Sequence, residues 1–214
     1  MILDLCSGLG GASQAFVDAN DEVVRIDIDR GFKPTIQADV QYLPIRSELR
    51  PDVIIFCPPC RAFSLMAIWH YWDKGKPKNA KTESAIRLVK KGLEEIHRIN
   101  PKYWVMENPM GMLRTVIGKP RSTIRQSDYG ARWKKPTDLW GNVPFRMLPS
   151  TRTWLKSPSG SRLWETRQGS DSILLSSTES NDKRQRSAQR AKWPYGLSQA
   201  VREATISTYK SEVK

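Results

Sequence analysis

The stretch DVIIFCPPCRAFS, at residues 52–64, constrains the fold more than any other. Residues 53–56 are apolar and mostly β-branched, which is typical of a central parallel strand buried on both faces. Pro58 and Pro59 end this strand, because proline has no N–H to donate to a sheet ladder and fixes φ at about −65°. Cys60 is therefore expected on a stiff turn at the carboxyl end of a strand, the edge at which open α/β sheets bind ligands.

Strands and helices alternate along the chain. Apolar runs predict strands at residues 2–5, 22–29, 36–39, 52–57, 103–106 and, less regularly, 173–175. Helical spacing predicts a long helix at 82–99 and shorter helices at 12–17 and 197–206, whereas residues 65–81 read as a loop. This alternation indicates an α/β fold, a parallel sheet with helices on both faces.

The composition is that of a globular chain. Its 214 residues, 39% hydrophobic, suffice for one domain with a core. No apolar run approaches the roughly 18 residues that a membrane span needs, and the N-terminus lacks the basic segment of a signal peptide. Three cysteines are too few and too unevenly spaced for a disulfide framework, which favours a reducing, cytoplasmic compartment.

Positive charge is concentrated in the second half of the chain. Residues 1–100 contain 14 Lys and Arg against 13 Asp and Glu, whereas residues 101–214 contain 21 against 9. A polyanionic partner releases counterions when it meets such a surface, so the charge distribution favours nucleic acid as the partner.

A glycine-rich turn, DLCSGLGG at residues 4–11, lies between the first strand and the first helix. Such a turn lets the backbone approach a ligand closely. Asp27, at the end of the second strand, is placed to accept hydrogen bonds from ribose hydroxyls, and Asp39 follows the third strand. Ser13 stands where a dinucleotide fingerprint has its third glycine, so the pattern favours an adenosine-bearing cofactor other than a dinucleotide.

A thiol and a carboxyl group each follow an apolar strand. If those strands are near one another, Cys60 and Glu107 emerge at the same edge of the sheet. A thiol hydrolase would need a histidine partner, and His70 and His97 are poorly placed for it. A thiolate that adds to C6 of a pyrimidine, with a carboxyl group at N3, fits the pair better. A redox or metal role for Cys57 and Cys60 is the rival reading.

Taken in order, these motifs resemble the cytosine-C5 DNA methyltransferase family, in the form of its small prokaryotic or phage members. DLCSGLGG is similar to the family's first cofactor motif, PPC-x-x-FS at residues 58–64 to its catalytic motif, and Glu107-Asn108 to its second catalytic motif. The run KPTDLWGN at residues 135–142 and PYGL at 194–197 are also similar to family segments. Arg61 and Pro109 depart from the family's Gln and Val, and residues 132–135 match its basic motif only approximately.

The resemblance implies a role for each matched residue. The catalytic residues it implies are Cys60, Glu107, Pro59 and Arg132. Those implied for binding S-adenosyl-L-methionine are Asp4, Ser7, Gly8, Leu9, Gly10, Asp27, Ile28, Asp39 and Pro58. Those assigned to DNA are Arg61, Ser64, Lys134, Lys135, Arg184 and Arg186.

The resemblance also implies a fold and a reaction. It implies a Rossmann-like methyltransferase sheet at residues 1–145, a very small target recognition region at 146–185 and a returning C-terminal segment at 186–214. The reaction it implies is methyl transfer to C5 of a flipped cytosine, most simply in double-stranded DNA, in a prokaryotic or viral, nucleoid-associated protein. We further expect residues 65–81, rich in Lys and Trp, to close over bound DNA.

Three other functions stay open from the sequence. One is methylation of cytosine in RNA, and another is a decayed module that only binds nucleic acid. The third is a nicotinamide-dependent oxidoreductase that uses the glycine turn.

Overall fold

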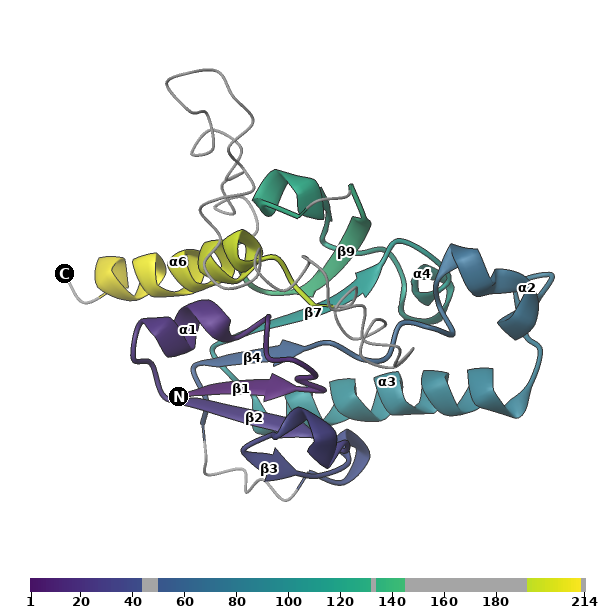
Figure 1. Ribbon diagram of the computed structural model, residues 1–214, viewed down its shortest axis with the longest axis horizontal. Helices are drawn as coiled ribbons and strands as arrows, with labels where there is room; N and C mark the ends of the chain where they lie inside the picture. The colour runs from purple at the N-terminus through teal and green to yellow at the C-terminus, as the bar shows by residue number, and fades with distance from the viewer. Residues whose placement is uncertain (44–49, 132–133, 145–191, 213–214) are drawn as a thin grey trace, which may run out of the picture.

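The protein is a sheet layered between helices, as the computed structural model in Figure 1 shows. The structure describes residues 1–43, 50–131, 134–144 and 192–212, with side chains up to residue 206. Arg132, Arg184, Arg186, the expected strand at 173–175 and the expected recognition region at 146–185 lie outside the described residues. In the part of the chain that is described, no helix is both long and apolar enough to cross a membrane.

Seven strands form the main sheet in the order β3-β2-β1-β4-β7-β9-β8. The five strands β1 to β4 and β7 run parallel, and β9 is antiparallel to both of its neighbours. Their bounds are β1 Ile2–Leu5, β2 Val23–Asp27, β3 Ile36–Gln37, β4 Val53–Phe56, β7 Tyr103–Pro109, β8 Ser122–Arg125 and β9 Pro136–Gly141. The α/β class and the helices on both faces, expected from the sequence, are confirmed.

Strand β4 is buried on both faces, because alternate side chains enter two separate cores. Val53 and Ile55 pack in the core beneath α1 (Gln14–Asp18) and α6 (Tyr195–Glu212). Ile54 and Phe56 pack in the opposite core, beneath α3 (Ala80–Ile99). The continuous apolar run of this strand is thus explained by helices on both sides of it.

Helix α3 begins at Ala80, two residues before the predicted start. The Asn79 side chain caps it by accepting a hydrogen bond from the Thr82 N–H at 3.0 Å. Asn100, with a left-handed φ of 53°, ends the helix at the predicted point. The shorter helices are α2 Ile68–Tyr71 and α4 Leu113–Ile117, with 3₁₀ turns η1 Arg30–Phe32, η2 Val40–Tyr42, η3 Leu65–Ala67 and η4 Gln126–Tyr129.

The expectation that residues 65–81 form a plain loop is wrong. This segment contains η3, α2 and a hairpin of β5 (Trp72–Asp73) and β6 (Lys76–Pro77). Lys74 and Gly75, both with positive φ, make the two-residue turn that suits the twist of such a hairpin. Single-sequence periodicity misses elements this short.

Gly92 marks a close contact between α3 and the sheet. A Cβ at this position would lie 2.4 Å from Cζ of the fully buried Phe56 ring. Glycine inside a helix normally costs stability, so replacing it with alanine would ordinarily help by about 1 kcal/mol. Here the ring leaves no room for the methyl group.

We therefore predict that Gly92→Ala lowers the free energy of unfolding, by about 1–3 kcal/mol, because overpacking outweighs helix propensity. The measurement is urea unfolding. In a protein that already carries Phe56→Leu, adding Gly92→Ala should lower the free energy of unfolding by less than it does in the parent protein. A single variant more stable than the parent would contradict this packing.

Candidate active site

The loops after three parallel strands meet at one edge of the sheet. β1 pairs with β4, and β4 pairs with β7 in the register Phe56 to Met106. The glycine turn follows β1, the Cys60 turn follows β4, and Glu107 lies within β7 one residue beyond that register. This is the edge at which parallel sheets hold their ligands.

Asp27 organises the glycine turn. Its carboxylate accepts hydrogen bonds from the Gly8 N–H at 2.8 Å and the Asp29 N–H at 2.9 Å. Gly8 has a φ of +50°, and the space in which a Cβ would stand is open. The backbone of this turn is therefore presented to the site without a side chain in the way.

A buried polar cluster supports the turn from the β2 side. Asp4 accepts a hydrogen bond from the Ser13 hydroxyl at 2.6 Å, and the Arg25 side chain donates to Ser13 Oγ at 3.0 Å and to the Gly10 carbonyl at 2.9 Å. Burial raises the pKa of Asp4 to about 6, although its Ser13 and Arg25 neighbours act to lower it. Gly10 has a φ of +71°, and a Cβ there would lie 2.4 Å from Cζ of Arg25, so another residue would strain the backbone and displace the guanidinium.

The surroundings of the turn fit an adenosyl group. Ser7 Oγ is buried and has no hydrogen-bond partner among the residues that the structure describes. Ile28, just beyond Asp27, is 65% exposed, and Leu9 is also exposed, so apolar surface is available for a flat ring. Asp39 follows β3, partly exposed, with its carboxylate capping η2 through the Gln41 N–H at 2.9 Å.

The Cys60 turn is tied to the strand that carries Glu107. The Asn108 side-chain amide donates to the Pro58 carbonyl at 3.2 Å, in a fully buried position. The N–H groups of Phe63 and Ser64 both donate to the Cys60 carbonyl at 3.0 Å, so the chain turns sharply after the thiol. Pro58 is buried beneath the turn and Pro59 is exposed beside Cys60.

Glu107 is buried and has polar neighbours on three sides. Gln126 Nε2 donates to its Oε1 at 3.4 Å, and Lys135 Nζ lies 3.9 Å from the same oxygen. The indole N–H of Trp193 also lies near enough to lower the pKa of Glu107, although the contact does not have the geometry of a hydrogen bond. The contacts of Gln126 and Lys135 are both with Oε1.

Burial and charge act in opposite directions on the thiol and the carboxyl group. Burial raises the pKa of the Cys60 thiol above its ordinary value of 9.0, the Glu107 charge raises it further, and the Lys135 cation lowers it. Burial likewise raises the pKa of Glu107, and Lys135 again opposes it. Because Lys135 acts on the pKa of both groups and Glu107 acts on that of Cys60, the three groups share one electrostatic environment.

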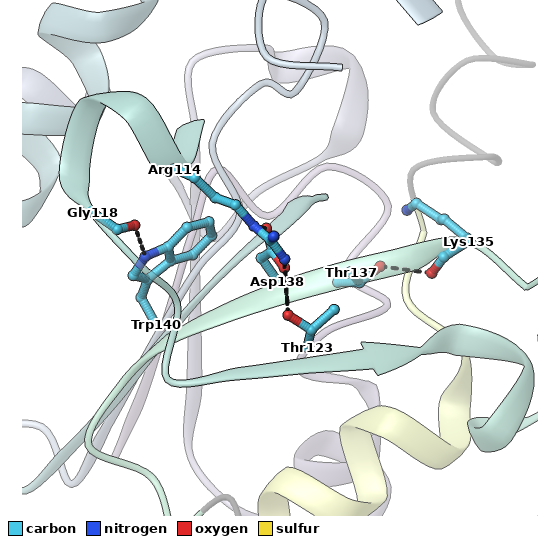
Figure 2. Close-up of polar contacts among 7 residues, drawn as sticks. All are labelled: Arg114, Gly118, Thr123, Lys135, Thr137, Asp138 and Trp140. Carbon is cyan, nitrogen blue, oxygen red and sulfur yellow. Dashed lines mark hydrogen bonds and ion pairs between the residues drawn. The ribbon is translucent and has the colours of Figure 1, made fainter. Parts of the chain in front are cut away.

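The backbone of Lys135 is held in an unusual conformation. Its φ is +28°, which a residue with a side chain rarely adopts. The Lys135 carbonyl accepts from the Thr137 hydroxyl at 3.0 Å, drawn in Figure 2, and from the Gln126 N–H at 3.3 Å. These contacts direct the chain so that the ammonium group reaches Glu107.

A buried carboxylate lies one strand further out. Asp138, fully buried on β9 and opposite Asn108 of β7, accepts two hydrogen bonds of 2.6 Å from Arg114 and one of 2.8 Å from the Thr123 hydroxyl (Figure 2). The Trp140 indole donates to the Gly118 carbonyl at 3.1 Å. Together these contacts join α4, β8 and β9 into the outer wall of the site.

Comparison with protein families decides the relationship. The model of the C-5 cytosine-specific DNA methylase family matches residues 1–127, well over half of the chain. The chain belongs to this family. The matched span includes the glycine turn, the Cys60 turn and Glu107, and ends before Lys135.

Solved structures with a similar arrangement are distant. One, from E. coli, is described as a DNA modification methyltransferase encoded within a prophage; it is 20% identical, with a TM-score of 0.47 over 69% of this chain and 50% of that one. Another, the PH0226 protein of Pyrococcus horikoshii OT3, is 18% identical, with a TM-score of 0.34 over 57% and 56%. This chain thus spans about half the length of either protein. No curated protein matches.

The sequence-predicted residues of this methylase family member fall into three groups. Cys60, Glu107, Pro59 and the glycine turn lie together at the sheet edge, with Asp27 and Asp39 on the neighbouring strands. Asp4 is buried within the support of the turn. Ser64 bridges to Gly111 near the site, and Arg61 and Lys134 are exposed.

Several residues of the site were not predicted as such. Lys135 was expected to contact DNA, and its contact with Glu107 follows from a positive φ that no sequence pattern reveals. Gln126 and Trp193 reach the site from separate elements. Arg25 and Ser13 left a faint signal, because an arginine between Val24 and Ile26 interrupts an apolar strand.

We predict that Arg114→Ala lowers the free energy of unfolding by about 2–4 kcal/mol, because it leaves the buried Asp138 carboxylate without its cation. Guanidinium chloride unfolding measures the loss. Arg121→Ala, which removes an exposed arginine from the same loop region, should change the free energy by less than about 0.5 kcal/mol. Equal effects of the two variants would show that the Asp138 contact does not hold this wall.

Proposed function

We propose that this protein transfers a methyl group from S-adenosylmethionine to C5 of cytosine in DNA, through a covalent bond between Cys60 and C6 of the base. The observation that carries the proposal is the electrostatic coupling of the Cys60 thiol to the Glu107 carboxyl group, beside a glycine turn. Membership of the C-5 cytosine-specific DNA methylase family supports the base and the atom.

The glycine turn and its neighbours would hold the cofactor. Asp27 uses one lone pair of each oxygen on backbone N–H groups, which leaves capacity to accept ribose hydroxyls. Ser7 Oγ offers a buried polar atom without a partner, and Ile28 offers apolar surface to the adenine. Bound there, S-adenosylmethionine supplies a methyl group that a carbon nucleophile can accept.

Cys60 and Glu107 would activate the base together. The cytosine must leave the stack, because C6 is inaccessible within a duplex. The Cys60 thiolate then forms a bond to C6 while Glu107 gives its proton to N3, which places the electron pair at C5. After C5 is methylated, water removes the C5 proton, the Cys60 thiolate leaves and N3 returns its proton to Glu107, so that the neutral aromatic ring is restored.

Burial suits Glu107 to this task. Burial raises the pKa of Glu107 and so increases the share of carboxyl groups that are protonated at any given pH, and only a protonated group can donate to N3. Gln126 and Lys135 engage Oε1, so we assign Oε2 to the base. Lys135 stabilises the carboxylate that remains after the proton has moved.

The first test of this function is methyl transfer by paired cysteine variants. Cys60→Ala should reduce transfer of tritiated methyl groups from the cofactor to DNA by at least about 10³-fold, because the nucleophile is lost. Cys57→Ala removes the other thiol of the same turn and should retain most activity. Transfer by Cys60→Ala at the parent rate would refute the covalent route.

The same assay with RNA of matched sequence tests the nucleic acid. Transfer to DNA and not to RNA is the expected result. Transfer to RNA alone would replace DNA with RNA as the substrate.

The second test is the pH dependence of kcat/KM. The reacting form has a Cys60 thiolate and a protonated Glu107, and its population is constant between the two pKa values. Below the pKa of Glu107 the thiolate is lost as pH falls, and above the pKa of Cys60 the protonated carboxyl group is lost as pH rises. Activity should therefore fall below the pKa of Glu107 and above that of Cys60. The Lys135 cation lowers both values, so Lys135→Met should move both limbs of the profile to higher pH, and Lys135→Arg should leave them in place. Unmoved limbs in Lys135→Met would exclude Lys135 from the site.

A further inference from the structure

An exposed apolar cluster lies directly beyond the Cys60 turn. Met66 is 85% exposed, Trp69 61% and Leu65 49%, although large apolar side chains of these types are usually buried in a core. An isolated bridge joins Ser64 to Gly111, whose neighbours in the chain, Leu65 and Met110, are both exposed. We call residues 61–79 the platform; its α2 lies at one end of the molecule (Figure 1).

The platform is fixed by contacts within the chain. Trp72 is buried, and its indole N–H donates to the Ala62 carbonyl at 2.6 Å, which closes residues 62–72 into a loop. At the far end, the Asn79 amide donates to the His70 carbonyl and the Thr82 hydroxyl to the Tyr71 carbonyl, both at 2.8 Å.

The start of the platform is pressed against the loop after β7. The Met112 N–H donates to the Phe63 carbonyl at 2.8 Å, and a Cβ at Gly111 would overlap that carbonyl oxygen. The apolar cluster is therefore held in position by contacts within the chain, and its first residue, Leu65, follows Cys60 by five positions.

The segment that carries the cluster is strongly basic. Residues 61–81 carry five cationic side chains and one acid, Asp73. All five are exposed, and Lys78 Nζ donates to the Trp69 carbonyl at 3.1 Å, so a cation adjoins the aromatic residue. They are Arg61, Lys74, Lys76, Lys78 and Lys81.

Exposed aromatic and thioether side chains in a basic segment are complementary to one chemistry, an unstacked base with its phosphates. A folded protein partner would be matched by the apolar cluster but not by the exposed cations. A paired duplex would be matched by the cations, but it presents no base face to Trp69.

We propose that the platform stacks an unpaired base next to the target cytosine, on Trp69 and Met66, while its lysines contact the flanking phosphates. This rests on the proposed function for the choice of DNA. It differs from the expectation that residues 65–81 close over DNA, since the platform is already formed. A preference for single-stranded or locally opened DNA follows.

The test is equilibrium binding of end-labelled DNA, single-stranded and in duplex form, to the whole chain without cofactor. Fluorescence anisotropy at one fixed salt concentration should show tighter binding of the single strand. Trp69→Ala should weaken that binding roughly 5- to 100-fold, the range for one stacked base, and change duplex binding little. Trp69→Phe should retain most of the affinity.

Control variants separate stacking from general effects. Tyr42→Ala removes an aromatic residue that is even more exposed than Trp69 and lies beside α3, and it should change neither affinity. Lys76→Ala should lower the salt dependence of single-strand binding by about 0.7 in log–log slope, whereas Lys90→Ala on α3 should not.

Two results would overturn the proposal that the platform stacks a base. One is Trp69→Ala binding the single strand as tightly as Tyr42→Ala, and the other is an equal loss on single strand and duplex. Neither result depends on catalysis. If the parent protein failed to transfer methyl groups but Trp69→Ala still weakened single-strand binding, the proposed function would be refuted and the base-stacking proposal would stand.

Discussion

The hydrogen bond from the Asn108 amide to the Pro58 carbonyl is the contact on which the site depends. It joins the turn after β4 to the strand β7 at a position that water does not reach. Proline cannot donate to the sheet at Pro58 or Pro59, so the turn needs an anchor of another kind. Asn108 provides it, and because Glu107 precedes Asn108 in the same strand, one contact fixes the relation between thiol and carboxyl group.

The electrostatics of the site are a balance between burial and one cation. Burial favours the neutral forms of both Cys60 and Glu107, and Lys135 favours the charged form of each. In such an environment the thiol can lose a proton while the carboxyl group supplies one to the base, and the total charge of the site and the base then changes little. The proposed reaction needs both transfers, because the thiol must lose a proton and the base must gain one.

The sequence predicts the centre of the molecule well. The apolar run of β4, the proline turn and the period of α3 follow from local chemistry, and they suffice to bring Cys60 and Glu107 to one edge. The outer wall escapes prediction, because β9 buries Thr137 and Asp138 and so lacks an apolar pattern. Asp138 is tolerated there only because Arg114, 24 residues earlier, lies against it.

Long-range contacts account for the other differences. Three residues from separate segments of the chain lie around Glu107: Gln126, Lys135 and Trp193. The sequence near each of them gives no sign that it reaches Glu107. The sequence predicts a loop at residues 65–81, because hydrogen bonds of the Trp72 and Asn79 side chains, and not a periodic apolar pattern, fix this segment. Where a side chain reaches across the fold to fix the backbone, residue spacing alone carries no information.

The most direct measurement is mass spectrometry of the protein after reaction with DNA in which 5-fluorocytosine replaces cytosine. Fluorine at C5 takes the place of the proton that must leave, so the bond between sulfur and C6 should persist. The account predicts a nucleotide attached to the peptide that contains Cys60, formed only with cofactor present. Attachment at Cys57 or Cys6, or methylation of ordinary DNA with no attached nucleotide from the fluorinated DNA, would contradict it.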